Sequence, residues 1–324
     1  MSVTASNYVK LSACCGYFNT PNATGVVCTS TSVYIIDSGV TPQDGEDIVS
    51  AVTELFPGKK IAAVINTHSH NDHSGGNAAI VRLTGAQVWC SREAECILRL
   101  PELVGYLYSG GKPLLEIQEH GRVKSEPCKA DKFLKETSIT CEEVTFTFVP
   151  LEGHFFGHYG IIADDGEKKV YYLGDGFFGK DMLKKAWLPF IYDADAFRKS
   201  VQKIEYTDCD FYVAAHGGIY TRETVHAAAE LNIIVTLEAE LKILKLLKEA
   251  PMTHEQLLKK ILDFAGMKPQ LIQYLLIGTT IQSYLSCLHD RGLIKYKLED
   301  NQMLWFNENT SDSDFINSAI NTSE

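Results

Sequence analysis

The stretch Thr67–Gly76, THSHNDHSGG, restricts the fold of this 324-residue chain more than any other part of the sequence. It places three histidines and an aspartate within six positions, directly after the apolar residues of KIAAVINTHSH at 60–70. An apolar run of this kind predicts a buried strand. His68 and His70 lie two apart, and alternation along a strand would send both imidazoles to one face. Two imidazoles on one face can chelate a single cation.

The next residues of the stretch predict a second cation nearby. Asp72 and His73 follow at a turn, and Ser74-Gly75-Gly76 lets the backbone approach closely before a helix begins. We expect these two side chains to bind a different ion from the one held by the first two histidines.

The segments around the motif alternate between strand and helix. Residues 25–40 predict two strands, 41–56 a helix, and strands return at 142–153, 158–164, 168–176 and 210–218. Residues 91–138 interrupt this order with helical stretches and form a larger insertion than a connection needs. The pattern predicts an α/β layer structure with its chemistry at strand ends.

Further candidate ligands lie at the ends of later strands. A zinc ion needs three or four protein ligands, so the motif requires partners. His154 in LEGHFFGHYG, Asp175 in YYLGDGFF and His216 in YVAAHGG each follow a predicted strand beside glycine. His158 repeats four residues after His154, and we expect it to support a ligand rather than bind metal.

Taken together, HSHNDH, GHFFGH, GD, AHGG and the upstream IIDSG resemble the metallo-β-lactamase-fold hydrolase superfamily over roughly residues 8–230. The resemblance implies a four-layer αββα sandwich. It also implies a first metal on His68, His70 and His154, a second on Asp72, His73 and His216, Asp175 bridging the two, and Asp37 of IIDSG supporting the ligands. Imidazole and carboxylate ligands without thiolate favour two divalent zinc ions, and iron or manganese also fits them.

The bridging aspartate narrows the class of enzyme within this resemblance. The true β-lactamases of the fold lack it, so the chain looks more like hydroxyacylglutathione hydrolases, lactonases and phosphodiesterases. Flavodiiron oxygen reductases have glutamate where this chain has His70, whereas single-iron persulfide dioxygenases share HxHxDH and stay an alternative. We expect a zinc-dependent hydrolase in which a metal-bridging hydroxide, oriented by Asp72, cleaves an ester, thioester or lactone.

The residues that select the substrate are less evident from the sequence. Phe177 and Phe178 follow Asp175 directly, and Tyr192 lies in the following AWLPFIYDADAF segment with Phe190. These aromatic residues would line an apolar pocket over the metals or belong to the core. Asn22 lies in a turn-rich loop, residues 16–25, that borders the site in the family.

The C-terminal third changes to helices. Residues 236–308 predict three helices and a β-hairpin turning at Asp300–Asn301, an order that resembles a winged helix. This segment has nine Lys/Arg and nine Asp/Glu, and zero net charge is poor for phosphate contact. We therefore expect a catalytic domain at 1–235, an accessory domain at 236–308 and a disordered tail at 309–324. An endoribonuclease or phosphodiesterase is the alternative function, and a metal- or ligand-sensing nucleic-acid-binding protein is a second one.

Composition bounds the partners and the compartment. With 41 acidic and 30 basic residues the formal net charge is −11, which disfavours nucleic acid and anionic membranes as partners. The nine cysteines show no disulfide framework, the N-terminus shows no signal peptide, and no apolar run approaches the ~20 residues of a membrane span. We expect a cytoplasmic protein with a small-molecule substrate, and the 91–138 insertion is a candidate homodimer surface or lid.

Overall fold

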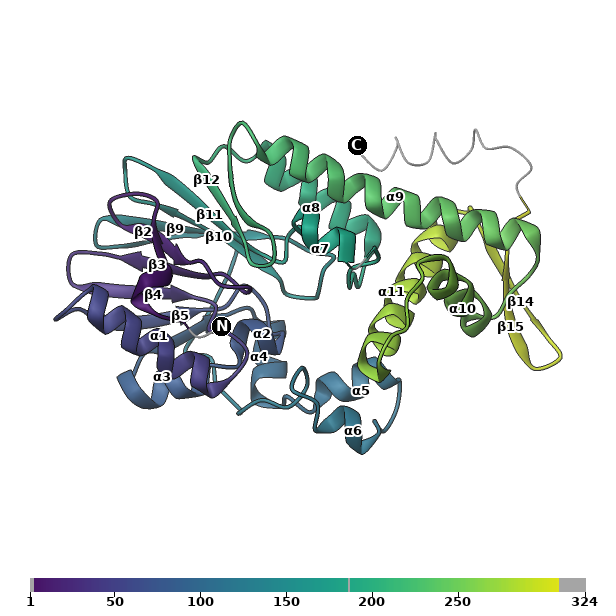
Figure 1. Cartoon of the computed structure of the whole chain (residues 1–324), viewed down its shortest axis with the longest axis horizontal. Helices are drawn as coiled ribbons and strands as arrows, with labels where there is room; N and C mark the ends of the chain where they lie inside the picture. Colours follow the sequence, from purple (N-terminus) through teal and green to yellow (C-terminus); the bar gives the residue numbers. More distant parts are fainter. Residues whose placement is uncertain (1–2, 186, 309–324) are drawn as a thin grey trace.

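Two β-sheets packed face to face form the centre of the molecule (Figure 1). The computed structural model describes residues 3–185 and 187–308. The first sheet has seven strands in sequence order, namely β1 (Tyr8–Lys10), β2 (Cys15–Phe18), β3 (Thr24–Cys28), β4 (Ser32–Ile36), β5 (Lys60–Ile65), β6 (Gln87–Cys90) and β7 (Lys132–Phe133). The second has the order β13 (Gly218–Thr221), β12 (Phe211–Ala214), β11 (Lys169–Gly174), β10 (Tyr159–Asp164), β9 (Val144–Pro150) and β8 (Ser138–Cys141).

Helices cover the outer face of each sheet, which confirms the four-layer αββα sandwich. The helices of the first half are η1 (Ala5–Asn7), α1 (Pro42–Leu55), α2 (Asn71–Ser74), α3 (Asn77–Thr84), α4 (Arg92–Arg99), α5 (Leu103–Ser109) and α6 (Leu115–Gln118). The later elements are α7 (Lys180–Lys185), α8 (Ala194–Tyr206), α9 (Val225–Glu249), α10 (His254–Phe264), α11 (Leu271–Asp290) and the hairpin β14 (Lys295–Glu299) and β15 (Gln302–Phe306).

Three apolar layers hold the sandwich together. Between the sheets, side chains such as Ile65 and Phe146 are fully buried. On the outer face of the first sheet, Ile48 of α1 and Ile80 of α3 pack over the strands. On the outer face of the second sheet, α8 and α9 pack over residues such as Tyr171. The predicted helix at 41–56 is α1, and a capping box between Thr41 and Asp44 begins it.

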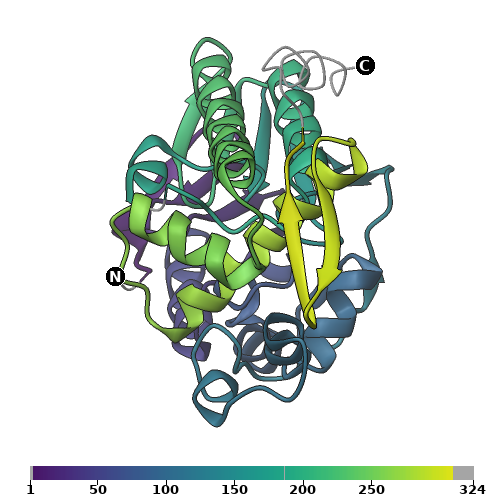
Figure 2. The same cartoon turned by 90° about the vertical axis from the view of Figure 1, so that its right-hand side faces the viewer.

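The long helix α9 joins the sandwich to the C-terminal elements (Figures 1 and 2). The expected domain boundary at 235/236 falls inside this helix, because one buried face continues from Val225 through Ala239 to Leu247. The predicted hairpin turns at Asp300 and Asn301, whose φ angles of 48° and 59° suit a two-residue turn. The likeness to a winged helix stays a prediction, and the expected tail at 309–324 lies outside the described residues.

A buried ion-pair network fixes α9 against its neighbours. The side chain of Glu240 on α9 is 0% exposed. Its Oε1 forms an ion pair with Arg198 of α8 at 2.8 Å and accepts a hydrogen bond from Arg291, just after α11, at 2.6 Å. The C-terminal helices and the sandwich therefore share charged as well as apolar contacts.

The helix α11 was not singled out by its sequence as an apolar segment. Within the described residues it is a helix that could cross a membrane by length and composition, although no such run was expected. Its apolar side chains Ile277, Ile281 and Leu285 are buried in the core beneath α9 and α10. Packing against those helices accounts for its apolar character.

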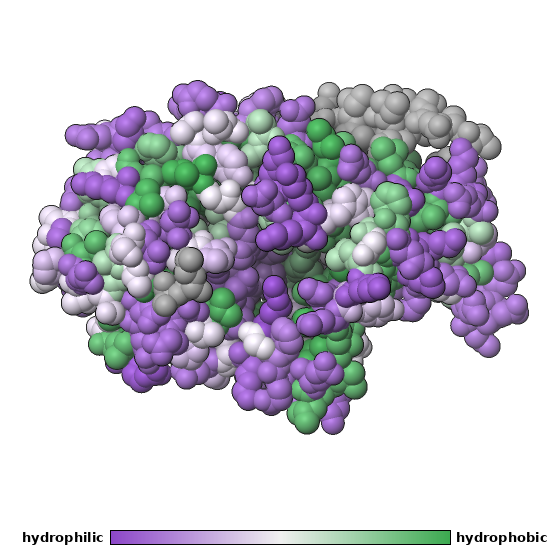
Figure 3. All heavy atoms as spheres, in the orientation of Figure 1, coloured by the Kyte–Doolittle hydropathy of each residue, from purple (hydrophilic) through white to green (hydrophobic). Residues whose placement is uncertain are grey.

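The 91–138 insertion contains α4, α5 and α6 and ends in β7, which extends the first sheet beside β6. Its buried side chains, including Val104 and Tyr108, form an apolar cluster with Ile272 of α11. Large side chains also remain exposed over α5 and α6, where hydrophobic residues gather in Figure 3, namely Leu103, Tyr106, Leu107, Leu114 and Leu115.

Candidate metal centre

The HxHxDH motif lies in a loop and a short helix rather than in a strand. Strand β5 ends at Ile65, so His68 and His70 lie beyond it and α2 begins at Asn71. The expectation that strand alternation aligns the two histidines was therefore wrong. Strand β5 places the loop that contains the two histidines at the end of the sheet. Hydrogen bonds to a residue at the end of the neighbouring strand β4 then orient this loop.

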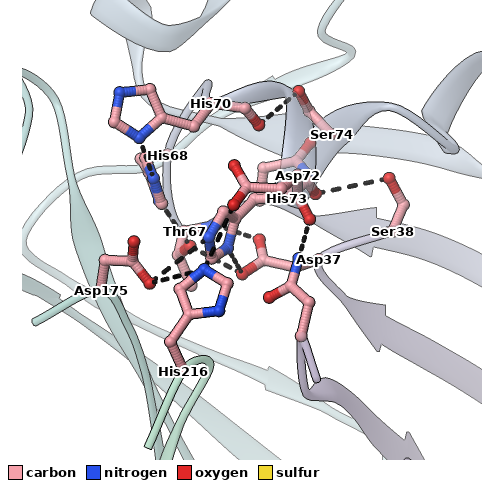
Figure 4. Close-up of polar contacts among 12 residues, drawn as sticks. Asp37, Ser38, Thr67, His68, His70, Asp72, His73, Ser74, Asp175 and His216 are labelled. Atoms are coloured by element: carbon pink, nitrogen blue, oxygen red, sulfur yellow. Dashed lines mark hydrogen bonds and ion pairs between the residues drawn. The ribbon is translucent and has the colours of Figure 1, made fainter. Parts of the chain in front are cut away.

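Asp37 provides those hydrogen bonds. Its Oδ1 accepts from the Thr67 backbone N–H at 2.8 Å, and its Oδ2 accepts from Thr67 Oγ1 and from His73 Nδ1, each at 2.8 Å (Figure 4). Asp37 follows β4, is almost fully buried and has a φ of 62°. One carboxylate thus fixes both the loop before the histidines and the ring orientation of His73.

The first group of candidate ligands contains three converging imidazoles. His70 Nδ1 lies 2.9 Å from His68 Nε2 and 3.0 Å from His154 Nε2. Burial lowers the pKa of all three histidines, so the rings are neutral at neutral pH. His154 Nδ1 donates a hydrogen bond to the Phe190 carbonyl at 2.9 Å, so the ring proton is on Nδ1 and the lone pair on Nε2 is free to bind a cation. Lone pairs directed at one point fit a divalent cation.

The second group contains Asp72, His73 and His216. His216 Nε2 lies 3.2 Å from Asp72 Oδ2, and His216 Nδ1 faces the Pro21 carbonyl at 3.2 Å. Burial would lower the pKa of both histidines, but nearby carboxylates, that of Asp175 first, outweigh it and raise both pKa values. The Nε2 atom of His73 is buried without a hydrogen-bond partner, as expected of an atom that binds metal.

Asp175 lies between the two groups. Its Oδ2 is 3.3 Å from His154 Nε2, and its Oδ1 is 3.4 Å from His73 Nε2 and 3.7 Å from His216 Nε2. Burial would raise the pKa of Asp175, but the charges of His216 and His73 outweigh it and hold that pKa well below its usual range. The carboxylate is therefore ionised and offers one oxygen to each group.

Close packing behind Asp175 explains the glycine before it. A Cβ at Gly174 would lie 2.5 Å from Thr67 Oγ1 and 2.8 Å from His158 Nε2, and its φ is 54°. His158 is outside both ligand groups. Its Nδ1 donates to the Leu151 carbonyl at 2.9 Å, and its Nε2 accepts the Asp175 backbone N–H at 3.2 Å. This histidine holds the backbone of Asp175 in place.

The structure thus brings all seven expected ligands into two adjacent groups of buried or half-buried nitrogen and oxygen atoms. Divalent ions of the zinc type prefer imidazole nitrogens and ionised carboxylates, and an ion in the second group would take the place of the protons that the carboxylates favour on His73 and His216. The residues present therefore fit a divalent metal.

A pocket of about 210 Å³ opens over these residues. Beyond five of the ligands it is lined by Asn71, Tyr108, Arg122, Phe178, Met182, Phe190 and Leu276. The insertion contributes Tyr108 and Arg122, and α11 contributes Leu276. No pattern near those three residues in the sequence marks them, because they reach the pocket only through tertiary packing.

The residues expected to select the substrate divide between the pocket and other places. Phe178 lines the pocket. Phe177 does not, because its ring is fully buried on the other side of the strand end against Tyr220. Tyr192 is 42% exposed and lines neighbouring grooves instead. The Asn22 amide donates to the Asp72 backbone carbonyl, so this residue holds a ligand segment in place.

Sequence comparison gives weak similarity to characterised enzymes. The atrochrysone carboxyl ACP thioesterase of Passalora fulva is 23% identical over 219 residues, which cover 67% of this chain and 54% of the relative. The hydroxyacylglutathione hydrolase GloC of Haemophilus influenzae is 27% identical over 148 residues, which cover 44% of this chain and 60% of the relative. The chain therefore spans less than two thirds of either relative.

Solved structures share the fold at low sequence identity. A beta-lactamase domain protein from Burkholderia ambifaria has a TM-score of 0.74 at 13% identity, covering 95% of this chain and 96% of its own. A metallo-beta-lactamase family protein from Thermus thermophilus has a TM-score of 0.67 at 15% identity, covering 93% of this chain and 97% of its own.

The family comparison agrees with the geometry. The metallo-beta-lactamase superfamily matches residues 19–216, a range that begins before Asp37 and ends at the last candidate ligand, His216. The matched range and the His/Asp cluster at the ends of the two central sheets both indicate this superfamily. This chain is a hydrolase-type member of the metallo-beta-lactamase superfamily with a site for divalent metal.

Proposed function

We propose that this chain is a dinuclear zinc hydrolase that cleaves esters, thioesters or lactones of small molecules. The observation that carries the proposal is the Asp175 carboxylate, whose Oδ2 faces His154 at 3.3 Å and whose Oδ1 faces His73 at 3.4 Å. A carboxylate with one oxygen directed at each of two ligand groups is suited to joining two metal ions.

Two bound zinc ions would supply an acidified water and would polarise the scissile carbonyl. The protein itself supplies orientation and charge. His73 and His216 outweigh the effect of burial and hold the pKa of Asp72 below its usual range, so its Oδ2 is ionised. With metal bound, that oxygen would be an acceptor for a hydrogen bond from the attacking water and would orient the water toward the substrate.

The pocket favours an acyl group as the substrate. Phe178, Met182, Phe190 and Leu276 form apolar walls beside the candidate ligands, and such walls would exclude water from an acyl chain bound there. The names of the relatives, a thioesterase and hydroxyacylglutathione hydrolases, agree with acyl transfer to water.

Cleavage of a phosphodiester or RNA is the weaker candidate. The pocket wall contains one arginine and no lysine among its described residues, and the 236–308 segment has no net charge. Nucleic-acid binding generally uses clusters of basic side chains.

The test combines metal analysis with a substrate panel. Elemental analysis should find about two zinc ions per chain, and the panel contains S-lactoylglutathione, a homoserine lactone, an aryl ester and a bis-aryl phosphate. Asp175→Asn should lose metal and turnover together, whereas Asp181→Asn, a change of an exposed carboxylate on α7, should retain both. Full metal content and full turnover in Asp175→Asn would refute the dinuclear site. Cleavage of the phosphate alone would replace the acyl hydrolase with a phosphodiesterase.

A further inference from the structure

Three polar groups in the pocket wall are outside the candidate ligand set, and none of them forms a hydrogen bond or an ion pair within the described residues. They are the Arg122 guanidinium, the Tyr108 hydroxyl and Asn71 Oδ1. Asn71 is only 7% exposed, and its Oδ1 is buried without a hydrogen bond. An amide oxygen accepts hydrogen bonds and does not donate them, so the groups that bear on an anionic ligand are the two donors, the Arg122 guanidinium and the Tyr108 hydroxyl.

The backbone next to Arg122 is tied to the motif, while the Arg122 side chain itself is exposed at the rim of the pocket. Asn71 is the neighbour of Asp72, and its amide nitrogen donates to the carbonyl of Gly121 and to the carbonyl of Val40 at 2.9 Å. The residue before Arg122 is therefore hydrogen-bonded to the first turn of α2. Val123, the residue after it, is buried in the cluster between the insertion and α11.

The charge of Arg122 is not balanced by the protein. Two basic side chains of this region have carboxylate partners, since Arg99 lies 3.9 Å from Glu95 and Lys124 pairs with Glu119. Arg122 forms no ion pair within the described residues, although the chain has a net charge of −11. Among the described residues that line the pocket, no other arginine and no lysine is present besides Arg122.

Tyr108 adds a neutral donor beside this cation. Burial raises the pKa of Tyr108 well above its usual range, so its hydroxyl keeps its proton. Its ring packs edge-on against Phe190 at 5.7 Å, which holds it at the pocket wall. A guanidinium and a phenol hydroxyl in one wall are donors suited to an anionic oxygen.

We propose that Arg122, assisted by Tyr108, is a specificity-determining residue that binds an anionic group of the substrate. The preferred substrate is then an acyl ester or thioester that carries a carboxylate or phosphate away from the scissile carbonyl. The apolar walls hold the chain between the two ends. The inference rests on the proposed acyl hydrolase function and names its substrate class.

The test compares two aryl esters of equal length. Para-nitrophenyl valerate ends in a methyl group, whereas mono-para-nitrophenyl glutarate ends in a carboxylate. The zinc-loaded wild type should prefer the glutarate ester. Arg122→Gln should lose about ten- to hundredfold in kcat/KM on that ester, mainly through KM, because a hydrogen bond to a charged group is lost. It should keep its activity on the valerate ester and its zinc content.

Arg99→Gln is the matched control, since it removes an arginine of the same insertion that does not line the pocket. It should leave both esters unaffected. Equal losses on both esters in Arg122→Gln would show a merely structural role and overturn the inference. A wild type that cleaves the valerate ester as well as the glutarate ester would overturn it too.

Binding without turnover separates this inference from the proposed function. Glutarate or inorganic phosphate should raise the melting temperature of wild type and of Arg99→Gln but not of Arg122→Gln, and the stronger ligand identifies the anion. If neither ester is cleaved but this difference persists, the acyl hydrolase function is wrong and the anion site stands. If neither anion stabilises the wild type, the anion site is wrong.

Discussion

Replacing Asp37 by Asn should weaken the second group of ligands selectively. The substitution keeps the shape of the side chain, and asparagine tolerates the φ of 62° found at this position. Asp37 accepts three hydrogen bonds, two from Thr67 and one from His73 Nδ1. An amide offers one acceptor oxygen and one donor nitrogen in their place.

The consequence for His73 can be worked out from the geometry. If the new oxygen stays on the Thr67 backbone N–H, the new N–H₂ group faces Thr67 Oγ1 and His73 Nδ1. It can then satisfy His73 only if the ring proton moves to Nε2, which removes the lone pair required for metal. Loss of such a supporting partner typically costs 10- to 100-fold in metal affinity, or about 1.4–2.8 kcal/mol.

The assay is a zinc titration followed by elemental analysis of Asp37→Asn against wild type. If the proposed dinuclear site is right, the variant should retain an ion on His68, His70 and His154 and should lose most of the other ion under a competing chelator. Asp165→Asn is the control, because Asp165 also accepts several hydrogen bonds, including those of Ser12 and the Cys14 N–H, but lies far from the ligands. If Asp37→Asn binds two ions with wild-type affinities, the assignment of Asp37 as the residue that orients His73 is wrong.

Three other predictions follow from the same contacts. Glu240→Gln should lower the free energy of unfolding by roughly 1–3 kcal/mol in urea titrations, because it removes the buried carboxylate that Arg198 and Arg291 share and leaves Asp195 as their remaining counter-charge. The exposed Glu238→Gln on the same helix should have little effect. Hydrogen bonds from Ser30 and Thr31 lower the pKa of Glu142 from 4.5 to about 2, so its stabilising effect is complete above pH 4.5 and is lost as the pH falls toward 2. Glu142→Gln should therefore reduce the change in unfolding free energy with pH between pH 2 and 4.5. An unchanged pH dependence would contradict this role of the Glu142 carboxylate. Zinc at a thousandfold excess over its Kd should stabilise the folded chain by about 4 kcal/mol. Removal of metal by a chelator should therefore lower the melting temperature measured by calorimetry, and re-addition of zinc should restore it.

The sandwich and the ligand residues could be predicted from the sequence because their signals are local. Apolar runs mark the strands, Thr41 marks the start of α1, and Asp300–Asn301 marks the last hairpin. The ligands follow strand ends beside glycine, and the order of the strands then brings them together. The reason expected for the alignment of His68 and His70 was wrong, since a side chain 30 residues upstream, Asp37, orients their loop.

The pocket wall could not be predicted in the same way. Phe177 and Phe178 are adjacent and chemically identical, and only the direction in which each leaves the strand end decides which one faces the metals. Tyr108 and Leu276 are separated by 168 positions along the chain and meet because the insertion packs against α11. Such contacts depend on tertiary structure alone, and no local pattern encodes them.

The same contacts give the C-terminal helices a role that requires no nucleic acid. α11 supplies Leu276 to the pocket and supports the insertion through Ile272, while Glu240 and its arginines fix α9 and the end of α11 to α8. The insertion in turn presents Tyr108 and Arg122 to the metal ligands. Because α11 supports the insertion, deleting α11 would remove Leu276 from the apolar wall and would displace the insertion residue Arg122 from the pocket. In the proposed function the C-terminal elements would act on substrate selection through packing, whereas the candidate metal ligands all come from the sandwich.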